Sequence, residues 1–339
     1  MKRKVLVILH PTLLPPETLA GVPEKQADLW RTEFDVTSAL REQGHELQIL
    51  GVDDSLTELR SALLERPPDV VFNLLEEFNG IVAYDQHVVA YLELMQRTYT
   101  GCNPRGLLLS RDKVLCKQLL SFHRIPTPRF AVFPRGAKFR VPKNLKAPLF
   151  VKSATDDASL GLAQASLVED LAKLRERVEF MHAQTGSDVL VEEYIEGREL
   201  YVGVIGNDRL STLPIWELRF GSLPAIATRR VKWDRAYQQK NGISTGPALD
   251  LDPALRQRID QLARRLYRAL HLSGYARIDL RLRADGSLYV LEANANPNLA
   301  ADEDFAAAAA AAGLGYRALL ERIMRLGQGY QAAWRTHLG

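Results

Sequence analysis

The stretch YARIDLRLRADGSLYVLEANANPNLAADEDF, residues 275–305, carries the most informative pattern in the chain. Apolar residues alternate on both sides of Asp285-Gly286, a dipeptide typical of tight turns, and this predicts an antiparallel hairpin. Each predicted strand carries an acid among apolar neighbours, Asp279 in the first and Glu292 in the second, and Asn294 follows closely. If the two strands pair across the turn, these three side chains bring their oxygen atoms together.

Converging carboxylate and amide oxygens are the ligands that Mg²⁺ takes in proteins, often together with phosphate oxygens. Asp279, Glu292 and Asn294 are therefore predicted metal ligands. Arg277 lies two residues before Asp279 and points to the same face of its strand. A cation at that place suits a site that holds phosphate and carboxylate groups together. The alternative is a pair of acids on an exposed strand edge, which their apolar neighbours disfavour.

The rest of the chain predicts an α/β protein of several units. Residues 1–104 alternate strand and helix, with a buried strand at Val5–Leu9 and a helix over 24–43 that Gly44 ends; this indicates a small parallel sheet. In the next unit, Ser110 is a candidate N-cap for a helix to about His123. Further predicted elements are strands at 147–153, 188–195, 198–206 and 227–233, helices at 167–185 and 253–271, and a tightly packed helix containing the alanine run 306–312.

Composition excludes several classes of function. The 339 residues exceed one compact core, so two or three domains are expected. A net charge of +3 with scattered basic residues disfavours nucleic-acid binding, and no window is apolar for the roughly 20 residues that a membrane span needs. The apolar run at the start is too short for a signal peptide. Two cysteines in unlike contexts fit a reducing compartment, so a cytoplasmic protein is expected.

Cationic and small residues upstream suggest a phosphate site. Lys152 ends an apolar strand, and the loop that contains Ser159 and Gly161 can turn backbone N–H groups toward an anion. In the segment VEEYIEGREL, a strand leaves the core and its backbone could bond an adenine edge, while Glu199 could take ribose hydroxyls. In isolation each of these features also fits an ordinary surface.

Taken in order, the segments SRDKVLCKQLL, PLFVKSATDDASLGL, VLVEEYIEGRELYV, RRVKW and GYARIDLRLRADGSLYVLEANANPNL resemble the ATP-grasp superfamily, and within it the D-alanine–D-alanine ligase branch. The resemblance covers residues 104–325. It implies an α/β ATP-grasp fold of three domains: a parallel-sheet N-terminal domain (1–104), a central α+β lid domain (105–195) and a C-terminal α+β catalytic domain (196–339).

The resemblance also implies roles for individual residues. The ATP-binding residues would be Lys113, Lys152, Ser159, Gly161, Glu192, Glu193, Tyr194, Ile195 and Glu199. Lys232, on a mobile loop, would approach the terminal phosphate, and Arg277 would stabilise the oxyanion of a tetrahedral intermediate. Asp279, Glu292 and Asn294 would bind two Mg²⁺ ions, with Mn²⁺ as an alternative. The implied reaction joins a small carboxylate to an amino-acid-like amine through an acyl phosphate, and branch members are commonly homodimers.

The substrate side departs from this branch. Residues 11–30 lack its early Glu in a Ser-rich stretch, and acids replace its His-Gly and Ser positions elsewhere. The candidate substrate residues are Asn298, Asp302, Glu303, Asp304, Glu76 and Glu77. These acids indicate a cationic or polyamine-like acceptor, although acids in the first turn of a helix also suit the helix dipole. Three hypotheses follow: a ligase with altered substrates, a genuine D-alanine–D-alanine ligase of cell-wall synthesis, and an ATP-binding regulatory protein without turnover.

Overall fold

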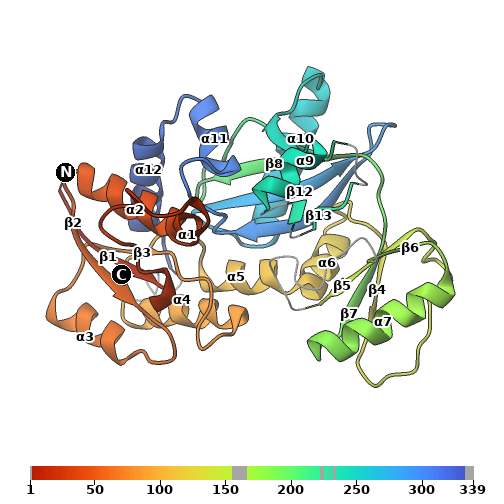
Figure 1. The fold of residues 1–339 in the computed structure, drawn as a ribbon, viewed down its shortest axis with the longest axis horizontal. Coiled ribbons are helices and arrows are strands. Elements are labelled where there is room, and N and C mark those ends of the chain that lie inside the picture. The colour runs from red at the N-terminus through yellow and green to blue at the C-terminus, as the bar shows by residue number, and fades with distance from the viewer. Residues whose placement is uncertain (1, 155–165, 222–224, 229, 232–233, 333–339) are drawn as a thin grey trace.

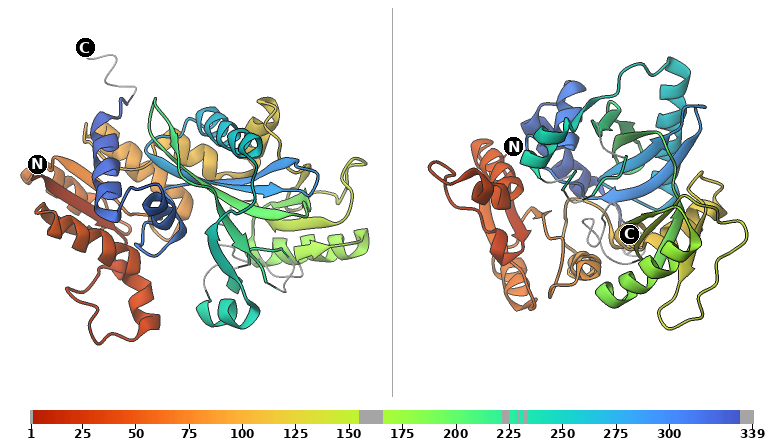
Figure 2. Two further views of the ribbon diagram at one scale, coloured as in Figure 1. Left: turned by 90° about the horizontal axis from the view of Figure 1, so that it is seen from above. Right: turned by 45° about the vertical axis from the view of Figure 1, so that its right-hand side comes forward.

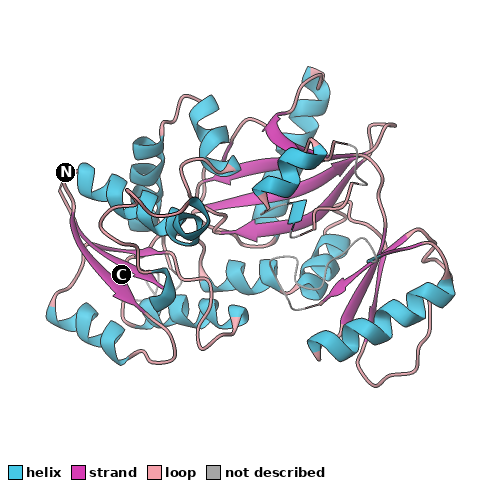
Figure 3. Cartoon of the chain, in the orientation of Figure 1, coloured by secondary structure: helices cyan, strands magenta, loops and turns pink. Residues whose placement is uncertain are grey.

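The computed structural model describes residues 2–154, 166–221, 225–228, 230–231 and 234–332. Three separate sheets organise these residues, and helices pack around them (Figures 1 and 3). Each sheet falls within one of the three predicted units, while the residue limits of the domains themselves stay a prediction. No helix in the described part of the chain is both long and apolar enough to cross a membrane.

The first sheet is parallel, with the strand order β2-β1-β3, and confirms the predicted strand–helix alternation. Gly44 ends the long N-terminal helix with a φ of 80°. The single helix predicted over 24–43 is instead three short pieces. The elements are β1 (Lys4–Leu9), η1 (Pro11–Leu13), α1 (Glu24–Ala27), η2 (Asp28–Trp30), α2 (Arg31–Glu42), β2 (Glu46–Gly51), α3 (Thr57–Glu65), β3 (Val70–Asn73), η3 (Val82–Tyr84) and α4 (Asp85–Leu94).

The second sheet is antiparallel, with the order β4-β7-β5-β6. The predicted N-cap role of Ser110 is wrong, because its hydroxyl donates to the Gly106 carbonyl one turn earlier inside a helix. The cap of the predicted helix is Asp112, so this helix starts at Lys113, and Asn103 caps a separate helix that precedes it. The elements are α5 (Pro104–Arg111), α6 (Lys113–Phe122), β4 (Phe130–Phe133), β5 (Leu149–Ser153), β6 (Leu167–Val168), α7 (Leu171–Thr185) and β7 (Val189–Glu193).

The third sheet has the order β11-β10-β8-β12-β13, with β9 beside β8. It confirms the hairpin, and Gly286 adopts a φ of 79° in its turn. The prediction of a strand over 227–233 is wrong, because none of the described residues in this range belongs to a strand. One edge of the third sheet is formed by β10 and β11. The elements are β8 (Arg198–Ile205), β9 (Ser211–Thr212), β10 (Trp216–Arg219), α9 (Arg235–Asn241), β11 (Ser244–Pro247), α10 (Pro253–Ala269), β12 (Tyr275–Leu282), β13 (Leu288–Ala295), α11 (Asp304–Ala311) and α12 (Tyr316–Gly329).

The chain returns to its beginning at the C-terminal end. The alanine run is helical in α11, and Gly313, with a φ of 80°, lies in the turn before α12. Helix α12 then packs against α2 and β3, beside the first sheet (Figures 1 and 2). Its apolar residues belong to the same core as the apolar face of that sheet, and they are Leu319, Leu320, Ile323 and Met324.

Candidate functional site

The β12–β13 hairpin gathers the predicted catalytic and metal-binding residues on one face of the third sheet. Asp279 lies directly opposite Glu292, and Arg277 directly opposite Asn294. Residues opposite one another in an antiparallel pair share a face, as do residues two apart on a strand. The four side chains line a cavity of about 690 Å³ between the three units. The convergence expected from the sequence is therefore present.

Arg277 and Asp279 form a rigid, buried ion pair at the base of this cavity. The Arg277 Nε and Nη2 atoms donate to Asp279 Oδ1 at 2.8 Å and Oδ2 at 3.0 Å. Burial alone would lower the pKa of Arg277, but the adjacent carboxylate raises that pKa above its ordinary value. The guanidinium also lies 4.5 Å from the centroid of the Tyr201 ring. Two hydrogen bonds and a ring contact thus fix the orientation of the arginine.

The oxygen donors on this face fit a divalent cation. Among the described residues no three His, Cys, Asp or Glu side chains cluster, so an ion here would rest on two carboxylates and an amide. The Asn294 Nδ2 atom is buried and has no hydrogen-bond partner in the described part of the chain. Since a buried N–H donor is normally satisfied, this nitrogen is poised for an acceptor that comes from outside the protein, such as a phosphate oxygen, whereas a metal ion would be bound by the amide oxygen. Mg²⁺ accepts such a partial shell because it keeps waters and phosphate oxygens as further ligands.

A second ion pair, between Arg281 and Glu199, borders the cavity on the same face. The Arg281 Nη2 atom donates to Glu199 Oε2 at 2.7 Å, and the Tyr201 hydroxyl donates to the other carboxylate oxygen at 3.0 Å. Burial, with Glu199 and Asp279 nearby, raises the pKa of Tyr201 well above its ordinary value, so this hydroxyl remains a donor. Glu199 is therefore held in one orientation at the cavity wall, where the ribose role predicted for it stays a prediction.

The second unit contributes lysines to the opposite wall. Asp112 accepts the Leu115 N–H at 2.8 Å, which starts α6 at Lys113 and brings this lysine into the cavity lining. Lys152 also lines the cavity, and its ammonium lies 3.0 Å from the Glu192 carboxylate.

Lys117 is a residue that the sequence analysis missed. Its Nζ atom lies 2.6 Å from Glu192 Oε1 and donates to the Thr127 hydroxyl at 2.7 Å. Burial and the nearby Lys152 lower its pKa well below the ordinary value. The signal in the sequence is a lysine on the apolar face of α6, where it replaces a residue of the core. Glu192 is thus clamped between two lysines from separate elements.

Replacing Glu192 with glutamine should destabilise the protein by roughly 3–5 kcal/mol, because two buried ammonium groups lose their counterion. If Lys152 binds ATP as the sequence predicts, the KM for ATP should rise as well, since Glu192 would no longer hold this lysine in place. Urea unfolding and ATP-dependent kinetics measure the two effects. A matched change of the exposed Glu58 to glutamine on α3 should alter neither. Unchanged urea stability of the Glu192 variant would contradict the buried arrangement.

The segment after β7 lines the cavity next to these lysines. The backbone N–H groups of Glu193 and Tyr194 donate to the carbonyls of Arg129 and Pro148, at 2.8 and 2.9 Å. An adenine edge would therefore have to use other backbone groups of this segment. Ile195 is buried at the cavity wall. The adenine-binding role of residues 192–195 stays a prediction. The side chain of Glu192 already contacts Lys117 and Lys152.

The predicted substrate residues divide into two groups. Five of them line the cavity: Glu76, Glu77, Asn298, Glu303 and Asp304. Asp302 is exposed and does not belong to that lining. Asn298 also has a local structural role, since its Oδ1 atom accepts from the Thr32 hydroxyl at 2.7 Å and from the Ala300 N–H at 2.8 Å.

Glu33, on α2, is a second cavity residue that the sequence analysis missed. It is only 6% exposed, and it follows the buried spacing of α2 with Val36, Thr37 and Leu40. Burial, opposed by its own backbone N–H and reinforced by Glu76, raises its pKa from 4.5 to about 7. An acid at an apolar-face position of an amphipathic helix is the signal that could have identified it.

The raised pKa of Glu33 predicts a specific pH dependence of stability. Between pH 4.5 and about 7 the folded state holds this proton more tightly than the unfolded state, so stability should fall as the pH rises through that range. The loss attributable to Glu33 is on the order of 3 kcal/mol. Urea unfolding of wild type and Glu33→Gln at pH 5 and pH 7.5 measures this contribution of Glu33 to the free energy of unfolding, because the variant lacks the titrating group. Parallel pH profiles of the two proteins would refute the assignment.

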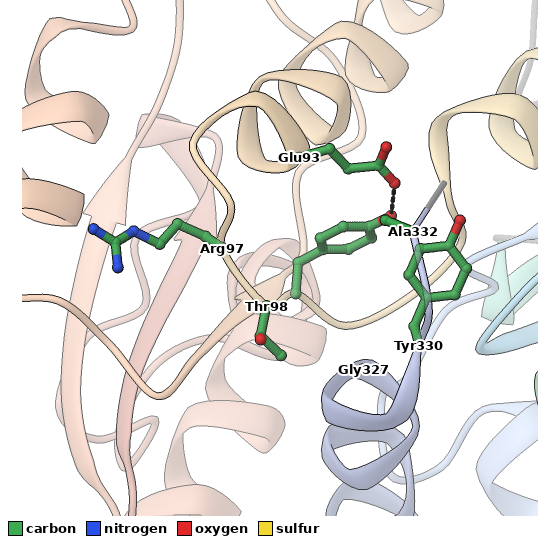
Figure 4. Close-up of a pocket in the computed structure, with 7 residues that line it drawn as sticks. Glu93, Arg97, Thr98, Gly327, Tyr330 and Ala332 are labelled. Atoms are coloured by element: carbon green, nitrogen blue, oxygen red, sulfur yellow. Dashed lines mark hydrogen bonds between the residues drawn. The ribbon is translucent and has the colours of Figure 1, made fainter. Parts of the chain in front are cut away.

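Three of the predicted residues, Lys232, Ser159 and Gly161, lie outside the described residues. A second cavity, of only about 10 Å³, lies beside α12, and there the Tyr99 hydroxyl donates to Glu93 at 2.7 Å (Figure 4). It shares no lining residue with the larger cavity. The larger cavity, with its cations and acids, is therefore the candidate active site.

Comparisons with known proteins agree with this fold. The family described as the D-ala D-ala ligase C-terminus matches residues 119–325. The chain is 32% identical over 280 residues to the D-alanine–D-alanine ligase of Desulfotalea psychrophila, covering 81% of this chain and 83% of that protein. It is 35% identical over 304 residues to the uncharacterized protein y4sG of Sinorhizobium fredii, covering 87% and 86%.

Solved structures show the same fold at lower sequence identity. The D-alanine–D-alanine ligase of Bacillus anthracis complexed with ATP superposes with a TM-score of 0.74 at 22% identity, covering 99% of this chain and all of that one. The VanG D-Ala:D-Ser ligase of Enterococcus faecalis gives a TM-score of 0.69 at 19% identity, covering 96% and 100%. With the family match and the identity to named ligases, the chain belongs to the D-alanine–D-alanine ligase family of ATP-grasp carboxylate–amine ligases.

Proposed function

We propose that this protein uses ATP to join a small carboxylate to an amine, and that its substrate pair is not two molecules of D-alanine. The carboxylate oxygen would attack the γ-phosphorus of ATP and release ADP. The amine would then attack the acyl carbon, losing a proton as phosphate leaves and the amide forms. One observation carries the ligase activity: Arg277, Asp279, Glu292 and Asn294 share one face of a cavity that also receives Lys113 and Lys152. The altered substrate pair is proposed from the acids elsewhere in the same lining, among them Glu76, Glu77 and Glu303.

The distribution of charge suits phosphoryl transfer. Phosphoryl and acyl transfer are accelerated by fixed cations placed where negative charge develops. Lys113 and Lys152 approach from the second unit and Arg277 from the third, so the terminal phosphate would lie between them. Arg277 is held by Asp279 and Tyr201, which lets it stabilise an oxyanion without reorientation.

Asp279, Glu292 and Asn294 would hold the divalent cations that accompany ATP. Two Mg²⁺ ions are proposed, with Mn²⁺ as a substitute. When bound, they neutralise phosphate charge and orient the terminal phosphate for transfer. Asp279 can serve such an ion while paired to Arg277, because a carboxylate offers about four acceptor positions.

The test is ATP turnover against a panel of amino acids and amines, with Mg²⁺, with Mn²⁺ and with a chelator. ADP and phosphate release that depends on substrate and metal, together with an amide product detected by mass spectrometry, would support the ligase. Turnover restricted to D-alanine would establish the alternative that the ligase relatives favour, a genuine D-alanine–D-alanine ligase. ATP binding without product under the whole panel would indicate a regulatory protein. A homodimer in the cytoplasm stays a prediction, and light scattering tests its first part.

A further inference from the structure

We propose that the N-terminal end of the cavity is a subsite for a terminal ammonium group on an aliphatic stem, seated between Glu33 and Glu76. The substrate class would then be an aliphatic diamine or a basic amino acid. This inference rests on the proposed ligase function only in taking the bound molecule to be a substrate. The binding itself can be measured without turnover.

Charge at this end of the cavity has a single sign. The first unit and residues 298–304 provide part of its lining. Among the described residues, every charged side chain in that part is an acid: Asp28, Glu33, Glu76, Glu77, Glu303 and Asp304. The cationic residues of the lining come from α5, α6, β5 and β12 instead. A ligand that reaches this end therefore meets a negative potential, which favours a cation and disfavours a carboxylate.

Glu33 supplies the observation that separates a binding site from an ordinary acidic surface. Its side chain is more than nine-tenths buried and lines the cavity, yet in the described part of the chain it has no ion pair and no hydrogen bond from another residue. Buried carboxylates are normally paired, because removal from water is costly. An unpaired one at a cavity wall indicates a cation that comes from outside the protein.

Several neighbouring acids have polar or charged partners within the protein. Glu77 lies 3.6 Å from His10, and Asp28 lies 3.6 Å from Arg31. The negative charge of Asp304 helps to raise the pKa of Arg277. Glu76 acts on Glu33, and this like-charge interaction contributes to the raised pKa of Glu33. An ammonium group between these two would relieve both the repulsion and the burial of charge.

The subsite is held in place by contacts across the units. The Thr32 hydroxyl donates to Asn298 at 2.7 Å, and the Asp35 carboxylate accepts the Ala301 N–H at 2.9 Å. These bonds flank Glu33 on α2 and fix this helix against the segment after β13. Apolar lining from Leu13, Leu29 and Val82 accompanies the acids. An alkyl stem fits that lining, which is why we infer a terminal ammonium rather than a small α-amino acid alone.

The experiment compares substrates that differ only in the terminal ammonium. Lysine is paired with norleucine and ornithine with norvaline, in both enantiomers, and cadaverine is paired with pentylamine. Thermal-shift binding and kcat/KM are measured at pH 8 with wild type, Glu33→Gln, Glu76→Gln and the exposed control Glu58→Gln. Comparing the amino acids with cadaverine distinguishes a basic amino acid from an aliphatic diamine as the preferred ligand.

We expect at least a tenfold preference of wild type for the cationic member of a pair. In Glu33→Gln and Glu76→Gln the preference should fall to within about twofold, with the KM for ATP unchanged. Equal use of both members by wild type, or a preference that survives in Glu33→Gln, would overturn the subsite while leaving the ligase proposal intact. Ammonium-dependent thermal protection in wild type and not in Glu33→Gln, without any turnover, would support the subsite and contradict the ligase. Absence of protection together with absence of turnover would refute the subsite as well.

Discussion

Glu292→Gln should lower kcat by about a thousandfold, equal to roughly 4 kcal/mol of transition-state stabilisation. The reason is geometric: Glu292 lies opposite Asp279 in the hairpin register, so its carboxylate is the second anionic donor of the proposed metal site. Glutamine keeps the shape of the side chain and one oxygen but removes the negative charge. ADP release at saturating ATP, measured across a Mg²⁺ titration, should show a much higher metal requirement.

The fold of this variant should be unaffected, with a melting temperature within about 2 °C of wild type, since Glu292 is only half-buried. Arg283→Gln, an exposed change near the turn of the same hairpin, is the matched control and should leave kcat unchanged. Wild-type turnover by Glu292→Gln would remove the metal assignment. A large loss of stability would instead show that the acid supports the hairpin itself.

Arg277→Met should destabilise the protein by roughly 3–5 kcal/mol and abolish turnover. Asp279 is 1% exposed and both of its oxygens accept from Arg277, so removal of the arginine takes away two charge-assisted hydrogen bonds and the adjacent positive charge from a buried carboxylate. The double variant Arg277→Met, Asp279→Asn removes both charges together. Its stability should return to within about 1 kcal/mol of wild type, while its turnover should stay absent.

This pair of variants separates the structural role of the ion pair from its catalytic role. Urea unfolding measures the first, and ADP release with the best substrate of the panel measures the second. Recovery of turnover in the double variant would show that neither charge takes part in the reaction. A double variant as unstable as the single one would show that the packing of Arg277 on Tyr201, rather than its charge, stabilises this face.

The hairpin was predictable because its pattern is local. Alternation with period two, a turn at Asp285-Gly286 and two acids among apolar neighbours are all contained within about twenty residues. The turn sets the register as far as Leu280 opposite Val290. A β-bulge next to Asp279 then shifts the pairing by one residue and puts Glu292, rather than Leu291, opposite Asp279, and the alternation alone does not predict this bulge. Family resemblance added Lys113 and sharpened the roles expected for Lys152 and the segment 192–195, which belong to the second unit and whose local patterns also fit an ordinary surface.

Glu33 and Lys117 could not be predicted in the same way. Each is a charged residue on the buried face of an amphipathic helix, and such a residue usually extends its charge to solvent. Only packing decides otherwise: Lys117 faces Glu192 on a strand 75 positions later, while Glu33 faces a cavity closed by residues near position 300. The cap at Asp112 was missed because serine and aspartate both favour N-cap positions, and Ser110 already lies inside the preceding helix α5.

The return of α12 to the first sheet has a consequence for synthesis of the chain. Leu319, Leu320, Ile323 and Met324 complete a core that β1 and β3 begin with residues such as Val7 and Phe72. The nascent amino-terminal unit must therefore leave the ribosome with an apolar face bare, and that face stays uncovered until α12 has also emerged. Ribosome-bound fragments that stop short of residue 316 should accordingly engage chaperones and remain protease-sensitive at their beginning, whereas fragments that expose α12 should be protected there.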